Sequence, residues 1–251
     1  MQGFQTLFFK EVLRFWKVAF QTILAPLVST LLYLLVFSQA MADHADVYPG
    51  VSYATFLIPG LVMMSMLQNA FANSSSSLVQ SRVTGNLVFV LLTPLSHWEF
   101  FGAYVLASMV RGVLVGLVVF VVASLLFVVP VREPLWAAVF VLLATMLAGT
   151  LGVLAGIWAE KFDQMAAWQN FVVLPLTFLS GAFYTLHSLS PFWAAVSRFN
   201  PFFYTIDGFR YGFLGSADVS PWESLLIVGG TCLALSWTTL GLLRRGWRLR
   251  T

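Results

Sequence analysis

Charged residues are scarce in this sequence. Only 9% of its 251 residues are Asp, Glu, Lys or Arg and 59% are apolar, whereas about 25% of residues are charged in a typical soluble domain. The chain therefore has too few polar groups to cover a surface in contact with water. Uncharged tracts at or beyond the roughly 20 residues that span hydrocarbon cover residues 18–42, 51–81, 134–159 and 224–243. This distribution predicts an integral membrane protein.

Several chemical signatures are also missing. A single cysteine, Cys232, excludes a disulfide framework within one chain. No stretch matches the GxxxxGK[ST] spacing of a phosphate-binding loop. The three histidines, His44, His97 and His187, fall in three separate loops rather than in one cluster. We therefore expect no enzyme activity, no metal site and no cofactor in this chain.

The long apolar tracts are expected to be helices, because the strands of a membrane barrel are about ten residues long and alternate strictly. Six spans are predicted, over residues 20–40, 54–74, 103–128, 135–158, 166–184 and 223–243. No internal repeat or low-complexity linker divides the chain. The expected fold class is thus an all-α integral membrane protein with one domain over residues 1–251.

The basic residues predict the orientation of these spans. An even number of spans places both termini on the same side, and basic residues concentrate in cytoplasmic loops. With cytoplasmic termini the inner set is Lys10, Arg14, Lys17, Arg82, Lys161, Arg244, Arg245, Arg248 and Arg250, and the outer set is Arg132, Arg198 and Arg210. The larger inner set favours cytoplasmic termini.

Three shorter elements accompany the spans. Residues 1–17 alternate as an amphipathic helix that suits a membrane interface. Residues 85–94 contain an apolar core too short to cross a bilayer, so they predict a short cytoplasmic helix that rests on lipid or on a partner. In the outer segment 185–222, Ser190-Pro191 and Asn200-Pro201 each pair an N-cap residue with a Pro at the first helical position. They predict two short, aromatic-rich helices that form a re-entrant hairpin.

Polar residues recur along one side of the second predicted span. Ser65, Asn69, Asn73 and Ser76 are spaced by three or four residues, so a helix aligns them in one stripe. One interpretation is that the stripe lines a substrate path or the seam between two copies of the chain. The alternative is hydrogen bonding between helices of one subunit. Both interpretations remain open at this point.

Arg111 lies within an apolar stretch, where an arginine is costly unless it reaches water or a partner. Because residues 112–131 alone are long enough to span, the simplest hypothesis places Arg111 at the inner membrane edge. A role in an inward-facing vestibule, or in binding an acidic lipid headgroup, is the alternative. Asp207 and Arg210 are three residues apart on the second outer helix and are expected to pair.

Small residues mark the expected packing face of the fourth span. Ala148, Gly152 and Gly156 are spaced by four residues, a pattern that lets two membrane helices approach closely.

With these elements placed, the chain resembles the ABC type-2 permease family, in particular its short bacterial inner-membrane members. Besides the amphipathic N-terminus, the likeness is carried by residues 85–94, Val110-Arg111-Gly112, Phe162-Asp163, 174–184 (LPLTFLSGAFY) and 199–212 (FNPFFYTIDGFRYG). The order of motifs from 174 to 212 is the most specific part.

The resemblance implies the membrane half of an ATP-driven exporter in the bacterial inner membrane. Such a permease pairs with a second copy, usually of itself, and with separate cytoplasmic ATPase subunits that bind ATP and Mg. Residues 85–94 would be the coupling helix, and the implied coupling residues are Arg82, Gly85, Leu87, Leu91, Leu92 and Pro94. Many members carry a Glu where this chain has Val88, which implies a more apolar docking surface, or docking through Arg82 or Glu99 instead.

The expected substrate is amphipathic, such as a lipid-linked saccharide, a lipid or a drug. An aromatic content of 16% and few charges within the spans suit an apolar or sugar-stacking path. Phe171 and Phe178 of the fifth span join the polar stripe as candidate path or seam residues, and Asn200, Pro201, Asp207 and Arg210 are the candidate residues of the outer helices. The alternative function is an ion-coupled secondary transporter that works without an ATPase.

Overall fold

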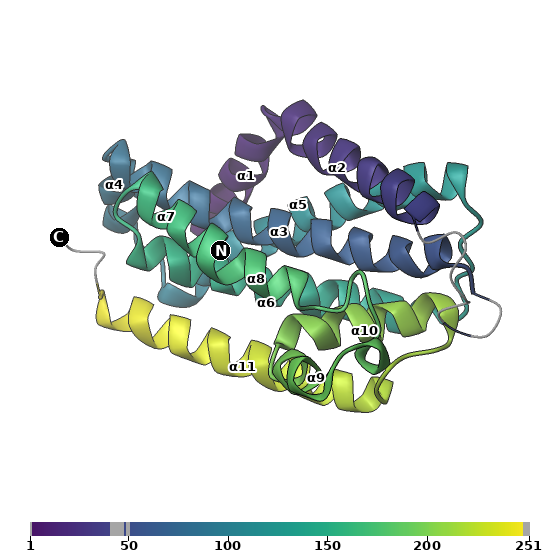
Figure 1. Ribbon diagram of the computed structural model, residues 1–251. Coiled ribbons are helices and arrows are strands. Elements are labelled where there is room, and N and C mark those ends of the chain that lie inside the picture. The colour runs from purple at the N-terminus through teal and green to yellow at the C-terminus, as the bar shows by residue number, and fades with distance from the viewer. Residues whose placement is uncertain (1, 41–47, 49–50, 248–251) are drawn as a thin grey trace.

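The computed structural model describes residues 2–40, 48 and 51–247, and within them the chain folds into helices without a named strand. Five helices are long and apolar enough to cross a membrane. They are α2 (Ala19–Ala40), α3 (Tyr53–Val83), α5 (His97–Leu126), α6 (Pro134–Trp158) and α11 (Pro221–Arg245). The expected all-α class is confirmed, and four of the helices run side by side as a bundle with α2 inclined above them (Figure 1).

The fifth predicted span takes a different form from the other five. It consists of α7 (Phe162–Trp168), the π-helical segment η1 (Gln169–Val173) and α8 (Leu174–Phe178), which follow one another directly. At 1.5 Å per residue these segments extend for about 25 Å. They end before the predicted boundary at residue 184, because Gly181 adopts a left-handed conformation with a φ of 73°. The total of six spans therefore stays a prediction.

Two of the spanning helices extend beyond their predicted limits at the end where α4 lies. α3 continues to Val83 rather than to residue 74, and α5 begins at His97 rather than at residue 103. The start of α5 has a capping box, in which the Ser96 side chain accepts from the Glu99 backbone and the Glu99 carboxylate accepts from the Ser96 backbone. Polar residues ended the predicted spans, but the backbone hydrogen bonding of a helix does not stop where its side chains become polar.

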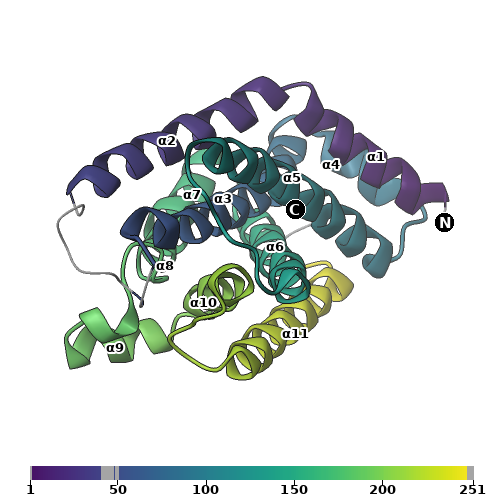
Figure 2. The ribbon, with the colours of Figure 1, turned by 90° about the vertical axis from the view of Figure 1, so that its right-hand side faces the viewer.

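The remaining helices lie at the two ends of the bundle. α4 (Asn86–Leu92) and α7 occupy one end together with the C-terminal end of α11, whereas α9 (Pro191–Arg198), α10 (Pro201–Leu214) and the short 3-10 turn Leu186–Ser188 occupy the other end (Figure 1). α10 is enclosed between α3, α6 and α11, while α9 projects at the edge of the molecule (Figure 2). Helices are thus present at every predicted short position, and their depth in a membrane stays a prediction. The predicted cytoplasmic residues Arg248 and Arg250 and the loop residue His44 lie outside the described residues.

α3 is the central helix of the bundle. Within its most apolar window 83% of the residues are buried, against 17% for α2. Its most extensive contacts are with α6 and α5. The small residues of α6 make this packing close, because a Cβ atom at Gly152 would overlap the Phe71 carbonyl and one at Gly156 would press on Leu78. The predicted packing face of the fourth span is confirmed.

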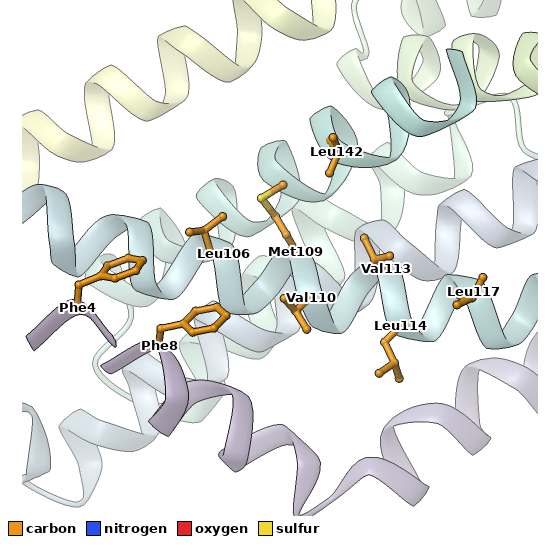
Figure 3. A pocket seen from close by; sticks show the side chains of 9 residues that line it. All are labelled: Phe4, Phe8, Leu106, Met109, Val110, Val113, Leu114, Leu117 and Leu142. Atoms are coloured by element: carbon orange, nitrogen blue, oxygen red, sulfur yellow. The ribbon is translucent and has the colours of Figure 1, made fainter. Parts of the chain in front are cut away.

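α1 (Gln2–Trp16) lies across the outside of α5 and leaves an apolar groove between them. Figure 3 shows Phe4 and Phe8 of α1 turned towards α5. The groove holds about 560 Å³, and all its lining residues are apolar: Phe4, Phe8, Leu106, Met109, Val110, Val113, Leu114, Leu117 and Leu142. Without a polar lining group it cannot orient a polar ligand.

The close contact of α6 with α3 gives a direct test of the fold. Replacing Gly152 by Ala should lower the free energy of unfolding by about 1–3 kcal/mol, because the added methyl overlaps backbone that cannot move aside. Gly229→Ala on α11 is the matched control, since no atom lies within 4 Å of its added Cβ. That control should be neutral or gain up to about 1 kcal/mol from helix propensity. Thermal unfolding in detergent measures both, and equal stabilities of the two variants would contradict the packing described here.

Candidate functional site

The polar stripe of α3 faces three other helices. Ser65 and the Thr30 hydroxyl of α2 lie 3.3 Å apart at hydrogen-bond distance. Asn69 accepts from the Arg111 guanidinium of α5 at 3.2 Å, and the Asn73 amide donates to Ser108 of α5 at 3.4 Å. These bonds link helices of one subunit, which is the second of the two interpretations that the sequence allows.

One end of the stripe also borders an open space. A cleft of about 230 Å³ separates α2 from α3, and Ser65 and Gln68 line it from α3. From α2 its wall includes Ser29, Thr30 and Tyr33. Ser65 is therefore within reach of a ligand between these helices, whereas Asn73 has no exposed surface. The stripe divides into a cleft-facing end and an enclosed end.

α1 contributes an ion pair to the enclosed end of the stripe. Arg14 donates to the Asn73 carbonyl at 2.7 Å, to its side-chain oxygen at 3.1 Å and to the Ser76 hydroxyl at 3.4 Å. The same guanidinium lies 3.3 Å from the Glu11 carboxylate, which is completely buried, and Lys10 approaches the other oxygen of that carboxylate at 3.5 Å. α1 is thereby fixed to α3 by polar contacts as well as by its apolar side.

Sequence reasoning missed Glu11. The buried side of α1 runs through Leu7, Glu11 and Phe15, whereas the amphipathic helix predicted over residues 1–17 had no acid on its apolar face. The signal was available, because Glu11 follows Leu7 by four residues and precedes Phe15 by four, which puts an acid on the face of two large apolar residues. A carboxylate on a buried face requires a cation, and Arg14 one turn later supplies it.

Arg111 lies near the middle of α5, not near its start. α5 begins fourteen residues before Arg111, about 21 Å along the helix axis. Its guanidinium reaches Asn69, while its Nε atom is buried and has no hydrogen-bond partner among the described residues. The hypothesis that Arg111 lies at the inner membrane edge stays a prediction, because helix bounds alone do not locate that edge. Arg111 belongs to the polar contacts of α3.

α4 exposes an apolar surface at its end of the molecule. The side chains of Val88, Phe89 and Leu92 are 58%, 70% and 76% exposed, and Leu91 is also exposed. Leu87, in contrast, is buried against the bundle. Of the residues predicted to couple, Leu91 and Leu92 thus point outward, whereas Leu87 fixes the helix in place.

Arg82 fixes the connection between α3 and α4 to the end of α6. Its guanidinium donates to the Ala159 carbonyl at 2.6 Å and to the Ile157 carbonyl at 3.2 Å, at the C-terminal end of α6. Gly85 then turns the chain with a φ of 74°, a conformation that glycine adopts readily. Pro94 follows α4 and is exposed. Arg82 therefore ties the start of α4 to the end of α6, and a docking role for it stays a prediction.

The predicted pair of Asp207 and Arg210 does not form. Asp207 accepts from the backbone N–H groups of Asp218 and Val219 at 2.8 and 3.1 Å. Arg210 is fully buried, donates to the Gly181 carbonyl at 2.7 Å and lies over the Phe56 ring at 3.9 Å. Each charge is thus partnered by a segment distant in sequence, which spacing along one helix cannot indicate.

Asn200 and Pro201 start α10 as predicted. The Asn200 side-chain oxygen accepts from the Phe202 backbone N–H at 3.0 Å, and its amide donates to the Leu176 carbonyl of α8 at 2.6 Å. This single side chain therefore caps α10 and fixes it to the continuous run of α7, η1 and α8, called the broken helix here. On that helix, Phe171 and Phe178 are 80% and 42% exposed, so both candidate aromatic residues face outward from the subunit.

A family model described as "ABC-2 type transporter" matches residues 2–214, most of the chain. The chain belongs to the ABC-2 type transporter family. It is a membrane transport subunit of that family, as the sequence resemblance predicted. Helix α10 with its buried Asp207 and Arg210, the broken helix and the exposed α4 all fall inside the matched region.

Curated relatives match nearly the whole length of this ABC-2 permease. The inner membrane transport permease YadH of Escherichia coli (strain K12) is 36% identical over 246 residues, which cover 96% of this chain and 94% of that protein. Nodulation protein J of Rhizobium meliloti (strain 1021) is 26% identical over 208 residues, 82% of this chain and 79% of the relative. Nodulation protein J of Neorhizobium galegae is 25% identical over 255 residues, 94% and 90% of the two chains.

Two buried carboxylates of the permease have partners among the described residues. Glu11 lies beside an arginine, and Asp207 accepts from backbone N–H groups. In the same part of the chain, no group of three or more His, Cys, Asp or Glu side chains is placed to hold a metal ion.

The Glu11–Arg14 contact predicts a measurable coupling. Glu11→Ala leaves the partly buried Arg14 without its carboxylate, so it should destabilise the permease by more than its effect in an Arg14→Ala background. We expect a coupling energy of about 1–3 kcal/mol from the double-mutant cycle, read by thermal unfolding in detergent. The matched cycle of Glu11→Ala with Lys17→Ala should be additive, because Lys17 forms no ion pair with Glu11 among the described residues. Additivity in both cycles would refute the ion pair.

Proposed function

We propose that this chain is the transmembrane permease subunit of an ATP-driven exporter and that it works as a dimer with a separate cytoplasmic ATPase. Membership of the ABC-2 family supports the transport role, and the relative YadH carries the name of an inner membrane transport permease. With its five long apolar helices the chain suits the same multi-pass location in the bacterial inner membrane. Both termini are proposed to be cytoplasmic, on the basis of the basic residues.

The observation that carries the proposal is the surface of α4. A helix of seven residues exposes Val88, Phe89 and Leu92 outside the bundle, and large apolar groups gathered in this way mark an interaction surface. An amphipathic helix of this kind fits a hydrophobic groove of a partner protein. ATP and Mg are proposed to bind to that partner and not to this chain.

The contacts that hold α4 against the bundle support transmission of movement from a partner to the spanning helices. Leu87 anchors it to the bundle, and Arg82 at its base binds the last carbonyls of α6. A push on α4 would therefore act on α3 and α6 together as a rigid body, which is a common form of coupling between domains. Val88, at the position where many family members have Glu, adds to the apolar area.

A second permease copy is proposed to pack on the side where α2 and the broken helix are exposed. α2 is only 17% buried over its most apolar window, so most of its surface must face lipid or another chain. Phe171 of η1 and Phe20 of α2 are 80% and 78% exposed. With Ser65 at the cleft between α2 and α3, this side offers both aromatic and hydroxyl groups to an amphipathic substrate.

Disruption of α4 tests the coupling directly. The double substitution Phe89→Asp and Leu92→Asp should abolish recovery of an ATPase when the tagged chain is purified from its native membrane in mild detergent, because two charges enter an apolar contact. Phe89→Leu with Leu92→Met is the matched control and should retain the ATPase. Full transport by a chain that recovers no ATPase, and its loss on addition of an ionophore, would instead establish the ion-coupled carrier.

The proposed path makes a second prediction. Phe171→Ala should reduce transport of an amphipathic substrate several-fold with little effect on folding, because an 80% exposed side chain contributes little to the core. Phe192→Ala on α9, also largely exposed at 69%, is the control and should transport normally. Transport rates in vesicles with matched protein levels compare the two. Equal rates for the two variants would remove Phe171 from the path.

A further inference from the structure

A basic and aromatic cleft lies where the C-terminal end of α11 meets the first turn of α5. It holds about 500 Å³ and is lined by His97 and Trp98 of α5 and by Trp237, Leu240, Gly241, Arg244 and Arg245 of α11. A smaller space of about 250 Å³ adjoins it, shares His97 and Arg244, and reaches Val90 and Leu91 of α4. Neither space touches the polar stripe of α3 or the broken helix.

The α11 wall of this cleft is one face of the helix. Its residues occur at positions 237, 240, 241, 244 and 245, which is the spacing of a single helical stripe. The same face continues towards the other end of the molecule through Leu233 and Leu226, which are 71% and 76% exposed. Between Leu233 and Arg244 the stripe runs for about 16 Å, from a purely apolar surface to two adjacent cations.

The two cations have no partner in the part of the chain that the structure describes. Arg244 and Arg245 are exposed, and neither guanidinium has a hydrogen bond or an ion pair among the described residues. His97 adds a third basic group beside them, in contact with the Trp98 ring at 5.6 Å. The nearby carboxylate of Glu99 accepts from the Ser96 backbone and hydroxyl, so it caps its own helix. An anion is the complement that the cleft lacks.

The aromatic groups decide the kind of anion. Trp98 and Trp237 are 60% and 78% exposed on opposite walls of the cleft, and exposed tryptophans concentrate at the level of lipid headgroups. A protein docked at this end of the molecule would make its apolar contacts with α4. The apolar stripe of the cleft extends along α11 instead. A ligand with a phosphate at one end and hydrocarbon at the other matches the whole length of the stripe.

We infer that this cleft is a binding site for one anionic phospholipid of the surrounding leaflet, with its phosphate at Arg244, Arg245 and His97 and its acyl chains along Trp237 and Leu233. The headgroup then lies against α4 through the adjoining space. This inference does not depend on the proposed ATPase or on the substrate. It rests on the charges, the exposed aromatic groups and the shape of one face of α11.

Native mass spectrometry of the purified full-length chain, released from detergent with phosphatidylglycerol or phosphatidylcholine added, tests the site. The wild-type chain should retain phosphatidylglycerol more tightly than phosphatidylcholine. Each arginine near a lipid surface changes affinity about five-fold, so Arg244→Gln with Arg245→Gln should lower phosphatidylglycerol affinity by about 25-fold. Lys10→Gln with Lys17→Gln removes the same charge from α1 and from the residue that follows it, and should retain the preference. An equal loss in both double variants would overturn the site.

A second variant separates shape from charge. No atom lies within 4 Å of a Cβ added at Gly241, which lines the cleft, so Gly241→Leu should fill the cleft and weaken phosphatidylglycerol binding with both arginines present. Gly229→Leu, equally open but twelve residues and about 18 Å from Gly241 along α11, should bind normally. Glycerol phosphate, which lacks acyl chains, should not displace the lipid. Unchanged binding by Gly241→Leu, or displacement by glycerol phosphate, would show a simple attraction of anions and refute the lipid site.

Discussion

The requirement that polar groups within a membrane find partners inside the protein governs this structure. α3 carries Ser65, Asn69 and Asn73 along one side, and helices α2, α5 and α1 each supply a partner to one of them. The opposite side of α3 is closed by the small residues of α6. The central position of α3 follows from these two demands, and the other helices take their places around it.

The two ends of the bundle are built on different principles. At the end that holds α9 and α10, Arg210 and Asp207 are buried and bind backbone groups of distant segments, so α10 is an integral part of the core. At the other end, α4 is held by one leucine and by the bonds of Arg82, and most of its apolar surface remains open. One end of the bundle is thus closed by buried polar contacts, and the other exposes an apolar surface.

Much of this architecture could be predicted from sequence because membrane constraints are strong and local. Apolar tract length identified five long helices, the Ser190-Pro191 and Asn200-Pro201 signals located α9 and α10, and the glycine spacing identified the face of α6. The ends of the helices were harder to predict from the sequence, because the Ser96–Glu99 capping box extends α5 beyond its apolar tract.

The candidate site was less predictable because its partners are far apart in sequence. Arg14 reaches Asn73 across 59 residues and Arg111 reaches Asn69 across 42, and periodicity within one helix gives no information on such pairs. The same limit explains why Asp207 and Arg210, correctly placed on one helix, were wrongly paired with each other. Long-range polar contacts are the part of the site that required the structure.

The π-helical turn in the broken helix has a mechanical consequence. Residues 169–173 form a wider turn than the α-helical turns on either side. This turn contains one residue more than an α-helical turn would. Rewinding that turn as an α-helix would rotate α8 by about 100° relative to α7. Phe178 would then sweep round the helix axis while Phe171 stayed near its place, so a small local change of winding could exchange which aromatic surface faces outward.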